Sequence, residues 1–315
     1  MSELQCERIE FPSADGEHTV VGRIYTMPEV PVRAVIQLSH GMCEYIERYA
    51  PMAAWFAAQG IALAGNDHLG HGDTAADGVY GYFGARGHDC IAEDLHTMNG
   101  LLREKFSGTP IVLYGHSMGS FYARWYAERW PETITALILE GTAGPRAINT
   151  VGYWLARVVS ALRGPMYISN RMTQAMFGSY NKRVVSPSTS YDWITRDEAV
   201  VRAYAADPRC TFQFTVAGLA DMLWTLCHVS TRKWACSLPK NLPILLIAGD
   251  ADPVGNYGAG VRDVWAMLGD AGIEDLYCQI YEGSRHELHN ETNRVEVFED
   301  VLTWLNDRLP GEQKA

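Results

Sequence analysis

The sequence predicts an α/β fold in which helices flank a mostly parallel central sheet, and three features of the chain support this prediction. Short apolar runs rich in β-branched residues alternate with helical patterns along the 315 residues. Polar residues and glycines gather directly after several of these runs, where open α/β sheets place their ligand sites. The alternation is interrupted once, by a long helical stretch. The chain length therefore fits one α/β core with one insertion.

Six apolar runs are predicted to form the strands of the central sheet. The first five each end near Gly, His, Asp or Asn, and the sixth lies near the end of the chain. They are residues 34–38, 61–64, 111–114, 137–140, 244–248 and 277–281. Because the carboxyl ends of parallel strands meet at one edge of a sheet, we expect the chemistry of the protein along that edge.

The long helical stretch is predicted to form a cap over that edge. Residues 150–234 are rich in Met, Trp and Tyr and contain no strand–helix alternation. We predict a helical cap over residues 146–236, inserted into an α/β core made of residues 1–145 and 237–315. One helix of the cap is predicted to be amphipathic, because apolar residues recur at helical spacing in Val151, Leu155, Val158 and Leu162.

The overall charge of the chain limits its partners. The net charge is −11, with an isoelectric point near 5.4. Binding to nucleic acid needs clustered Lys and Arg, so nucleic acid is not expected as a partner. The same acidity opposes a permanent polybasic anchor on anionic lipid, but permits transient contact of apolar side chains with a membrane surface. No segment approaches the roughly 18 apolar residues of a membrane span, so stable membrane insertion is not expected. The sequence sets no oligomeric state.

Cysteine usage and the first residues indicate a cytoplasmic location. The seven cysteines are odd in number and scattered without CxxC spacing. This pattern favours reduced thiols over a disulfide framework or a zinc site. Residues 1–10 lack the basic and apolar regions of a signal peptide. We therefore expect a cytoplasmic protein that uses no metal and no organic cofactor.

The pentapeptide GHSMG, residues 115–119, is the strongest local signal for chemistry. It follows the apolar run 111–114 and precedes a helical run over residues 121–129. A nucleophilic serine on a sharp strand-to-helix turn requires this context, with glycines where a Cβ would clash and a helix start that favours negative charge. An ordinary glycine-rich turn is the alternative. The strand and the helix favour Ser117 as a nucleophile.

A serine nucleophile needs an acid and a base, which in this arrangement follow it in the order Asp and then His. The loop GDADPVG, residues 249–255, directly follows the run 244–248. Its carboxylates therefore emerge at the same sheet edge as Ser117. Asp252 is the predicted acid. Asp250 is its competitor, and we expect it to be a turn residue at the end of the strand.

The base is expected after the last strand, where residues 282–287 read EGSRHE. His286 is the predicted proton carrier, because a neutral imidazole can take the Ser117 proton and return it to a leaving alcohol. His289 lies three residues further on. We expect His289 to be an exposed histidine at the start of a helix.

Negative charge on the acyl oxygen needs two N–H donors that are already in place. The first is the amide of Met118, the residue after the nucleophile. The second is expected in the loop HGM, residues 40–42, which follows the run 34–38, and we choose the amide of Met42. His40 is expected to brace this loop by hydrogen bonds and not to act as a base.

The chain resembles the monoacylglycerol lipase and lysophospholipase group of α/β-hydrolases, also described as serine aminopeptidase-like. Five motifs carry the resemblance and cover nearly the whole chain. They are HGMCE at 40–44 with Arg48-Tyr49, DHLGHG at 67–72, GHSMG at 115–119, and the segments that contain Asp252 and His286. The resemblance implies an α/β-hydrolase fold and activity on glycerides, lysophospholipids or other esters, and a structural role for residues 70–72. Three positions depart from the group near the oxyanion loop and the nucleophile, namely Tyr45, Thr74 and Ser120.

Methionine and aromatic side chains of the insertion suggest an apolar pocket for an acyl chain. The alternative is that they form the core of the cap itself. We choose Met222 and Trp224 as substrate contacts from a set that also includes Met166, Met172, Met176, Phe177 and Leu223.

The leading hypothesis is a carboxylic-ester hydrolase that acts on lipid-like monoesters through an acyl-enzyme on Ser117. A small-ester carboxylesterase or a serine aminopeptidase would use the same triad. A peptidase would also need acidic groups for the substrate ammonium, such as Glu44 or carboxylates of the cap. A ligand-binding protein that retains the fold without catalysis is a further alternative. Haloalkane dehalogenases and epoxide hydrolases are excluded, because they need aspartate at position 117, which is serine.

Overall fold

The structure is a computed structural model that describes residues 3–75 and 78–309. Its centre is an eight-stranded sheet in the order β1-β2-β4-β3-β5-β6-β7-β8. The strands are β1 (Gln5–Pro12), β2 (Thr19–Thr26), β3 (Ala34–Ser39), β4 (Ile61–Asn66), β5 (Ile111–His116), β6 (Ala136–Glu140), β7 (Ile244–Gly249) and β8 (Leu276–Tyr281). All six predicted strands are present, as β3 to β8. The two N-terminal strands were not predicted.

Strands β3 to β8 run parallel, so their carboxyl ends meet at one edge of the sheet. The register pairs Leu38 of β3 with Tyr114 of β5, and Tyr114 with Ile138 of β6. The strand β2 is antiparallel to both β1 and β4 and extends the sheet at the other end. The loops after β3, β5, β7 and β8, which contain the predicted site residues, therefore lie at the same edge.

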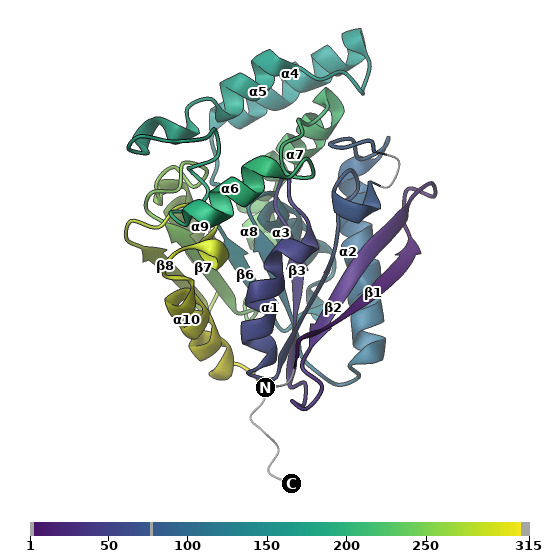
Figure 1. Ribbon diagram of the computed structural model, residues 1–315, viewed down its shortest axis with the longest axis vertical. Coiled ribbons are helices and arrows are strands. Elements are labelled where there is room, and N and C mark those ends of the chain that lie inside the picture. The colour runs from purple at the N-terminus through teal and green to yellow at the C-terminus, as the bar shows by residue number, and fades with distance from the viewer. Residues whose placement is uncertain (1–2, 76–77, 310–315) are drawn as a thin grey trace.

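Helices cover both faces of the sheet, so the core has three layers (Figure 1). On one face, α1 (Ala50–Ala57) and α10 (Arg294–Asn306) pack against apolar residues of the parallel strands. On the other face, α2 (Gly87–Lys105), α3 (Met118–Arg129) and α9 (Ala259–Asp270) bury the opposite set. Burial on both faces explains why the central strands read as continuous apolar runs and not as alternating ones.

The chain between β6 and β7 forms a group of helices over the carboxyl edge of the sheet. They are α4 (Ala147–Arg163), α5 (Asn170–Phe177), α6 (Glu198–Ala206), α7 (Val216–Val229) and α8 (Arg232–Ser237). The inner helix α7 packs against α2 and α3 of the core and supports α4 on its other side. The side chains of Asp197 and Thr215 cap the N-termini of α6 and α7.

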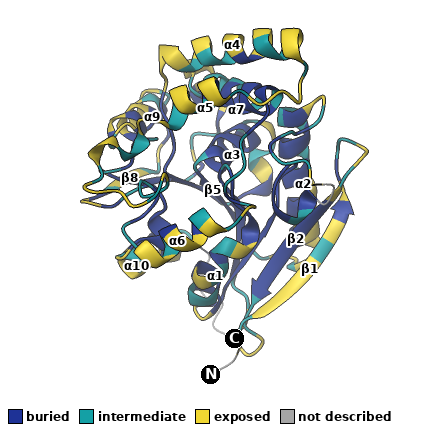
Figure 2. Ribbon diagram, turned by 45° about the horizontal axis from the view of Figure 1, so that its top comes forward, coloured by how far each residue is buried: buried dark blue, intermediate teal, exposed yellow. Residues whose placement is uncertain are grey.

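The predicted amphipathic helix of the insertion forms as α4, but its apolar stripe faces outward. Val151, Leu155, Val158 and Leu162 are between 51% and 77% exposed, and α4 is largely yellow at the top of Figure 2. The α4 residue Ala156 is buried. The periodicity thus predicted the helix, and the stripe it marked is an exposed apolar face of the molecule.

The described residues show two further features of the chain. None of their helices is long and apolar enough to cross a membrane. The seven cysteines are not joined in disulfides. The cysteines range from buried, such as Cys43 and Cys210, to exposed, such as Cys6.

We predict that Trp234→Ala lowers the free energy of unfolding by about 3–5 kcal/mol, the range for deletion of a large buried aromatic side chain. Trp234 is 1% exposed, and its indole N–H donates to the carbonyl of Arg124 at 2.8 Å. The matched control is Trp265→Ala on α9, because Trp265 is 43% exposed and a surface substitution costs about 0.5 kcal/mol or less. Urea unfolding followed by circular dichroism measures both. Equal losses in the two variants would contradict this account of the core.

Candidate active site

Ser117 lies on a sharp turn between β5 and α3. Its backbone has φ 51° and ψ −123°, a conformation that L-residues rarely adopt. The amide of Ser117 donates to the carbonyl of Glu140 at 2.9 Å and ties the turn to β6. A Cβ at Gly115 would lie 2.6 Å from the Cα of Ser120, and a Cβ at Gly119 would overlap backbone carbonyl oxygens of the loop after β3. The two glycines therefore permit the close packing that the pentapeptide predicted.

The structure places the predicted acid and base side by side. Asp252 is fully buried, and its Oδ2 lies 3.0 Å from Nδ1 of His286. The other oxygen, Oδ1, accepts from the amide of Val254 at 2.8 Å. Asp250 is exposed and accepts from the amide of Gly283 at 2.7 Å, as expected of a turn residue. Of the two carboxylates in this loop, Asp252 is the one that contacts the imidazole.

The electrostatics of His286 follow from its burial and its partner. Burial lowers the pKa of His286, but the Asp252 carboxylate raises it more, and the pKa lies above its ordinary value of 6.5. An acid beside Nδ1 also fixes which nitrogen faces the cavity. The side chain of His286 is thus arranged to exchange a proton at Nε2.

The loop after β3 is braced by histidines, as predicted for His40. Nε2 of His40 accepts from the amide of His68 at 2.9 Å, and Nδ1 donates to the carbonyl of Gly41 at 2.8 Å. Burial lowers the pKa of His40 to about 4, so the ring is neutral at pH 7. Met42, at the end of this braced loop, and Met118 line the same cavity as Ser117.

A buried carboxylate, Glu44, joins the loop after β3 to the turn that contains Ser117. It accepts from the amide of Gly41, from Nδ1 of His116 at 2.7 Å, from the Tyr49 hydroxyl at 2.8 Å and from Arg48 at 2.8 Å. Burial alone would raise the pKa of Glu44, but His116 and Arg48 hold it well below its usual range. Glu44 belongs to the HGMCE motif, and its contacts connect that motif to His116, which precedes Ser117.

The prediction that His289 is exposed at a helix start is wrong. His289 is 1% exposed, and its Nδ1 lies 2.9 Å from Oε1 of Glu140. The short 3₁₀ helix Leu288–Asn290 turns the ring inward, where it stacks on Tyr49 with 4.3 Å between the centroids. Burial would raise the pKa of Glu140, but His289 and then His116 lower it to about 2. Glu140 ends an apolar strand, and a carboxylate in that position signals a buried cation nearby.

Among the described residues, the group best placed to hold a metal ion is Glu44, His116 and His289. Their candidate ligand atoms lie within 4.8 Å of one another. The Glu44 carboxylate is already hydrogen bonded to Arg48, and His289 to Glu140. These residues thus form a buried hydrogen-bonded network with Arg48 and Glu140.

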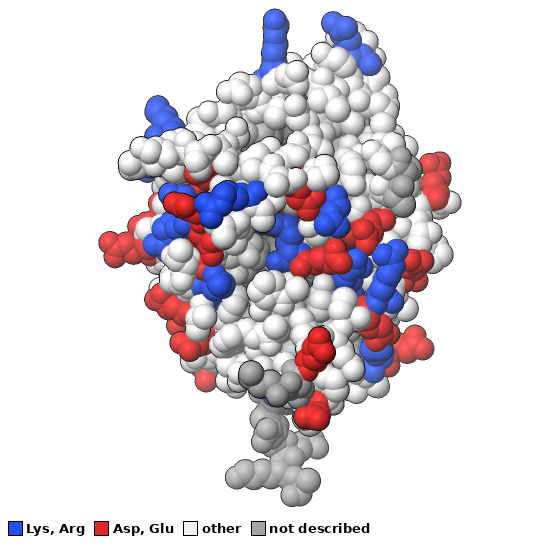
Figure 3. All heavy atoms as spheres, viewed as in Figure 1, with Lys and Arg blue, Asp and Glu red and all other residues white. Residues whose placement is uncertain are grey.

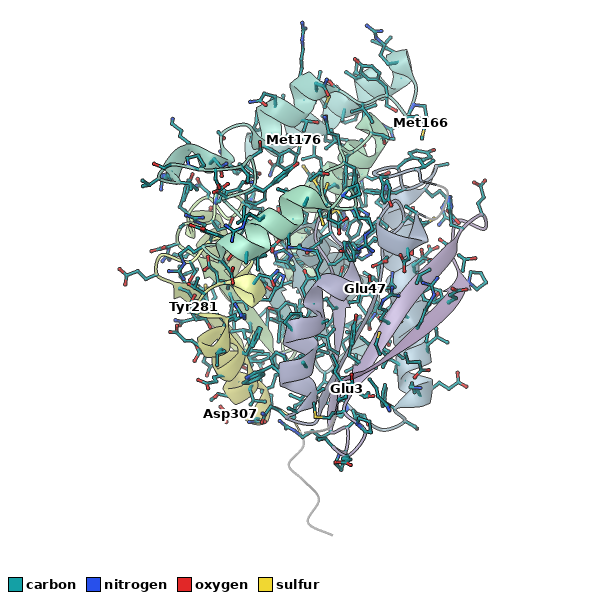
Figure 4. The ribbon with its side chains drawn as sticks, viewed as in Figure 1. Glu3, Glu47, Met166, Met176, Tyr281 and Asp307 are labelled. Carbon is teal, nitrogen blue, oxygen red and sulfur yellow. The ribbon has the colours of Figure 1, made fainter. Side chains whose placement is uncertain are left out.

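A cavity of about 530 Å³ opens beside Ser117 and His286, beneath the inserted helices. Its apolar wall includes Met118, Phe121, Ala143, Met176, Met222, Leu223 and Leu226, and its polar wall includes Asn181, Thr189, Ser190, Thr211 and Gln213. In Figure 4, Met176 belongs to α5, above the sheet edge. A cavity of this size, with a few polar groups, is typical of a small-molecule site.

Of the two substrate contacts predicted from sequence, the structure brings only Met222 to the cavity. Trp224 is not among the lining residues. Its ring packs between His88, at 4.2 Å between centroids, and His228, at 5.0 Å. The two residues lie on one helix, α7, but a separation of two residues turns their side chains to different faces. The sequence showed that this segment is rich in Met and aromatic residues, but it did not show which side of α7 faces the cavity.

A family profile described as serine aminopeptidase, S33, matches residues 30–293, which include Ser117, Asp252 and His286. The chain belongs to the serine aminopeptidase S33 family. The predicted resemblance to monoacylglycerol lipases and the predicted α/β-hydrolase fold are confirmed.

Three similar proteins are esterases or lipases. A carboxyl esterase from Bacillus coagulans, solved in complex with glycerol, has a TM-score of 0.91 and 32% identity, over 97% of this chain and 99% of the esterase. The monoacylglycerol lipase of Mycolicibacterium smegmatis is 28% identical over 287 residues, 90% of this chain and 91% of the lipase. Human monoglyceride lipase is 25% identical over 304 residues, 94% of this chain and 89% of the lipase. This S33 chain is therefore an enzyme of the hydrolase class, as predicted.

We predict that Asp252→Asn lowers kcat by about 10⁴, because an amide in place of the acid favours the wrong tautomer of the histidine. Asp250→Asn is the matched control in the same loop. It should keep kcat within about threefold, since the exposed Asp250 side chain accepts from a backbone amide and does not bond to His286 in the described structure. Initial rates on a soluble p-nitrophenyl ester compare the two. A large loss in Asp250→Asn with activity retained in Asp252→Asn would assign the acid to Asp250.

Proposed function

We propose that this chain hydrolyses monoacylglycerol-like or lysophospholipid-like esters through an acyl-enzyme on Ser117. One observation carries the proposal. Ser117 and His286 line a single cavity with an apolar wall, and Asp252 lies behind His286 at 3.0 Å. We propose further that residues 146–236 act as the cap of this site. The seven free cysteines support a cytoplasmic location for the enzyme.

In the proposed mechanism, the residues of the site act in two half-reactions. The Ser117 hydroxyl attacks the acyl carbon while Nε2 of His286 takes its proton, and the amides of Met42 and Met118 stabilise the oxyanion. The bond to the alcohol breaks as His286 returns the proton to the leaving oxygen. Water then attacks the acyl-enzyme, His286 takes a proton from it, and Ser117 leaves with that proton. Asp252 stabilises the imidazolium in both halves.

The lining of the cavity supports an ester over a peptide with a free ammonium group. Among the described residues that line it, the one carboxylate is Glu287. Both oxygens of Glu287 bind Arg48, at 2.9 and 2.7 Å, and one also binds Asn290 at 2.7 Å. The other carboxylate considered from sequence, Glu44, is bound to Arg48 and His116. An ammonium group would find no free carboxylate there, whereas an alkyl chain fits the apolar wall.

The relatives support the same substrate class. Two of them are named monoacylglycerol or monoglyceride lipases, and the esterase was solved with glycerol. A monoester of glycerol has one apolar chain and one small polar end. The cavity has an apolar wall on α5 and α7 and a polar wall that includes Asn181 and Gln213. The two ends of such a molecule match the two walls.

The outer face of the cap supports transient contact with an anionic lipid surface. Nine large apolar side chains are exposed there, namely Ile148, Val151, Trp154, Leu155, Val158, Leu162, Met166, Tyr167 and Ile168. Residues 141–191 contain six cations and no Asp or Glu, in a chain whose net charge is −11. Figure 3 shows blue and white at the top of the molecule, with red gathered below. The net charge of the whole chain argued against a permanent basic anchor on lipid. It did not reveal that residues 141–191 carry a net positive charge.

We predict that kcat/KM rises by one to two decades between acetyl and octanoyl p-nitrophenyl esters below their micelle concentrations. Each enclosed methylene contributes about 0.8 kcal/mol at most, and partial enclosure reduces that gain. Ser117→Ala should abolish turnover and labelling by a fluorophosphonate probe at every chain length. Labelling of folded Ser117→Ala, or a flat chain-length profile in the intact protein, would overturn the proposal.

Two methionine variants locate the acyl-chain site in the same assay. Met222→Ala should flatten the rise with chain length, because Met222 lines the cavity. Met267→Ala is the matched control, since Met267 lies on α9 and packs against the core. A rise unchanged by Met222→Ala would place the acyl chain against another part of the wall.

We predict that the protein sediments with vesicles of phosphatidylglycerol and phosphatidylcholine more than with vesicles of phosphatidylcholine alone, and less as salt increases. Val158→Asp should lower the bound fraction at least fivefold, because it places a charge on the apolar face. Val295→Asp is the matched control, since Val295 is also exposed, at 50%, but lies on α10. Equal binding to both vesicle types would contradict the role of the cap cations.

A further inference from the structure

An aromatic ring from the inserted segment lies against His286. The indole ring of Trp193 and the imidazole ring of His286 are 5.1 Å apart between centroids, with their planes tilted by 40°. Both side chains line the cavity. This separation lies within the roughly 4.5–7 Å of aromatic pairs and the roughly 6 Å over which a cation is attracted to an aromatic face. Trp193 is thus a direct neighbour of the proposed base.

A ladder of hydrogen bonds fixes the indole relative to the imidazole. It joins residues 192–196 of the insertion to residues 285–291, the segment that contains His286. The amide of Glu287 donates to the carbonyl of Ile194 at 2.7 Å, and the side chain of Arg285 donates to the carbonyls of Asp192 at 2.5 Å and Thr195 at 2.9 Å. The residues on both sides of Trp193 are therefore bonded to the residues on both sides of His286.

The indole is also supported by aromatic rings of the insertion. Tyr180 meets Trp193 edge to face, with 4.8 Å between centroids, and Phe177 packs against Tyr180 at 5.3 Å. Tyr180 begins a short 3₁₀ helix, Tyr180–Arg183, that also contacts the loop after Asp252. The guanidinium of Arg183 lies 3.5 Å from the centroid of the Tyr257 ring. The amide of Tyr257 in turn donates to the carbonyl of Asp252 at 2.8 Å. The same part of the insertion thus contacts the segments of both the base and the acid.

We propose that Trp193 is a positioning residue for His286, holding the imidazole against Asp252 and presenting an aromatic face to the imidazolium that forms during acyl transfer. The proposal rests on the function proposed above, in which His286 carries the proton. An aromatic face attracts the charged ring more than the neutral one. The indole therefore stabilises the transition state, in which the ring is charged, more than the resting enzyme.

The proposal fixes the sign of a pH effect. His286 acts as a base only when neutral, so activity is lost as the pH falls through its pKa, which lies above 6.5. Loss of the aromatic face, without admission of water, destabilises the imidazolium and moves this acid limb to lower pH. The other ionisable groups that face His286 are unchanged by a substitution at position 193, and they are Asp252, Glu140, His116 and Glu287.

The test compares Trp193→Leu, Trp193→Phe and the control Trp265→Leu, using kcat/KM from pH 5 to 9 on p-nitrophenyl butyrate. For Trp193→Leu we expect a plateau lower by about 3- to 30-fold, or about 0.7–2 kcal/mol at 1.4 kcal/mol per factor of ten, together with an acid limb at lower pH. Trp193→Phe should restore most of both. If the leucine variant does not fold, Trp193→Met replaces it as the variant without an aromatic ring.

Three outcomes overturn the proposal in different ways. A profile of Trp193→Leu that matches Trp265→Leu would show that the indole does not act on His286. A lower plateau with an unmoved acid limb, and no rescue by phenylalanine, would show a packing role only. Absence of turnover and of fluorophosphonate labelling in the intact protein would refute the proposed function itself.

Discussion

The active site depends on a steric constraint, the close approach of the first turn of α3 to the loop that follows β3. Gly119 lies so near the carbonyl oxygens of Ser39 and His40 that any larger side chain would collide with them. This approach brings Met118 and Met42 to one wall of the cavity. Ser117 has a backbone conformation that L-residues rarely adopt, and the strand β5 that leads into it is paired with a parallel strand on each side.

Three buried carboxylates and their partners stabilise the loops that form the site. The carboxylates of Glu44, Glu140 and Glu287 are almost completely excluded from solvent, and each would be strongly destabilising without a partner. Arg48 binds two of them, and His289 binds the third. Because these contacts connect the loop after β3, the strand β6 and the segment after β8, they hold together parts of the chain that are more than 200 residues apart. The HGMCE motif therefore contributes contacts that hold the loop after β3 in place, in addition to lining the cavity through Met42.

The parts of the fold that sequence predicted are those set by local pattern and by chain order. Buried parallel strands are apolar along their length, so β3 to β7 were found. The edge strand β8 was found from its apolar residues although only Tyr281 is buried, whereas β1 was missed because Glu7, Arg8 and Glu10 interrupt its apolar pattern. The glycines of the GHSMG motif and the order of Asp252 and His286 along the chain can likewise be recognised from sequence alone. The burial of His289 is not, since it depends on Glu140, 149 residues away. Trp193 gave no signal, because it lies in a loop whose position depends on contacts with residues distant in sequence, including the segment around His286.

The ladder between residues 192–196 and 285–291 also defines how this enzyme can be recombined with its relatives. The insertion is continuous in sequence between β6 and β7, yet its segments belong to different structural units. Residues 192–196 and the helix α7 are integrated into the core, whereas α4 contacts the rest of the molecule mainly through α7. A chimaera that exchanges the entire insertion removes backbone partners from the segment that follows β8. A chimaera that exchanges α4 alone leaves these bonds intact, because α4 packs mainly on α7.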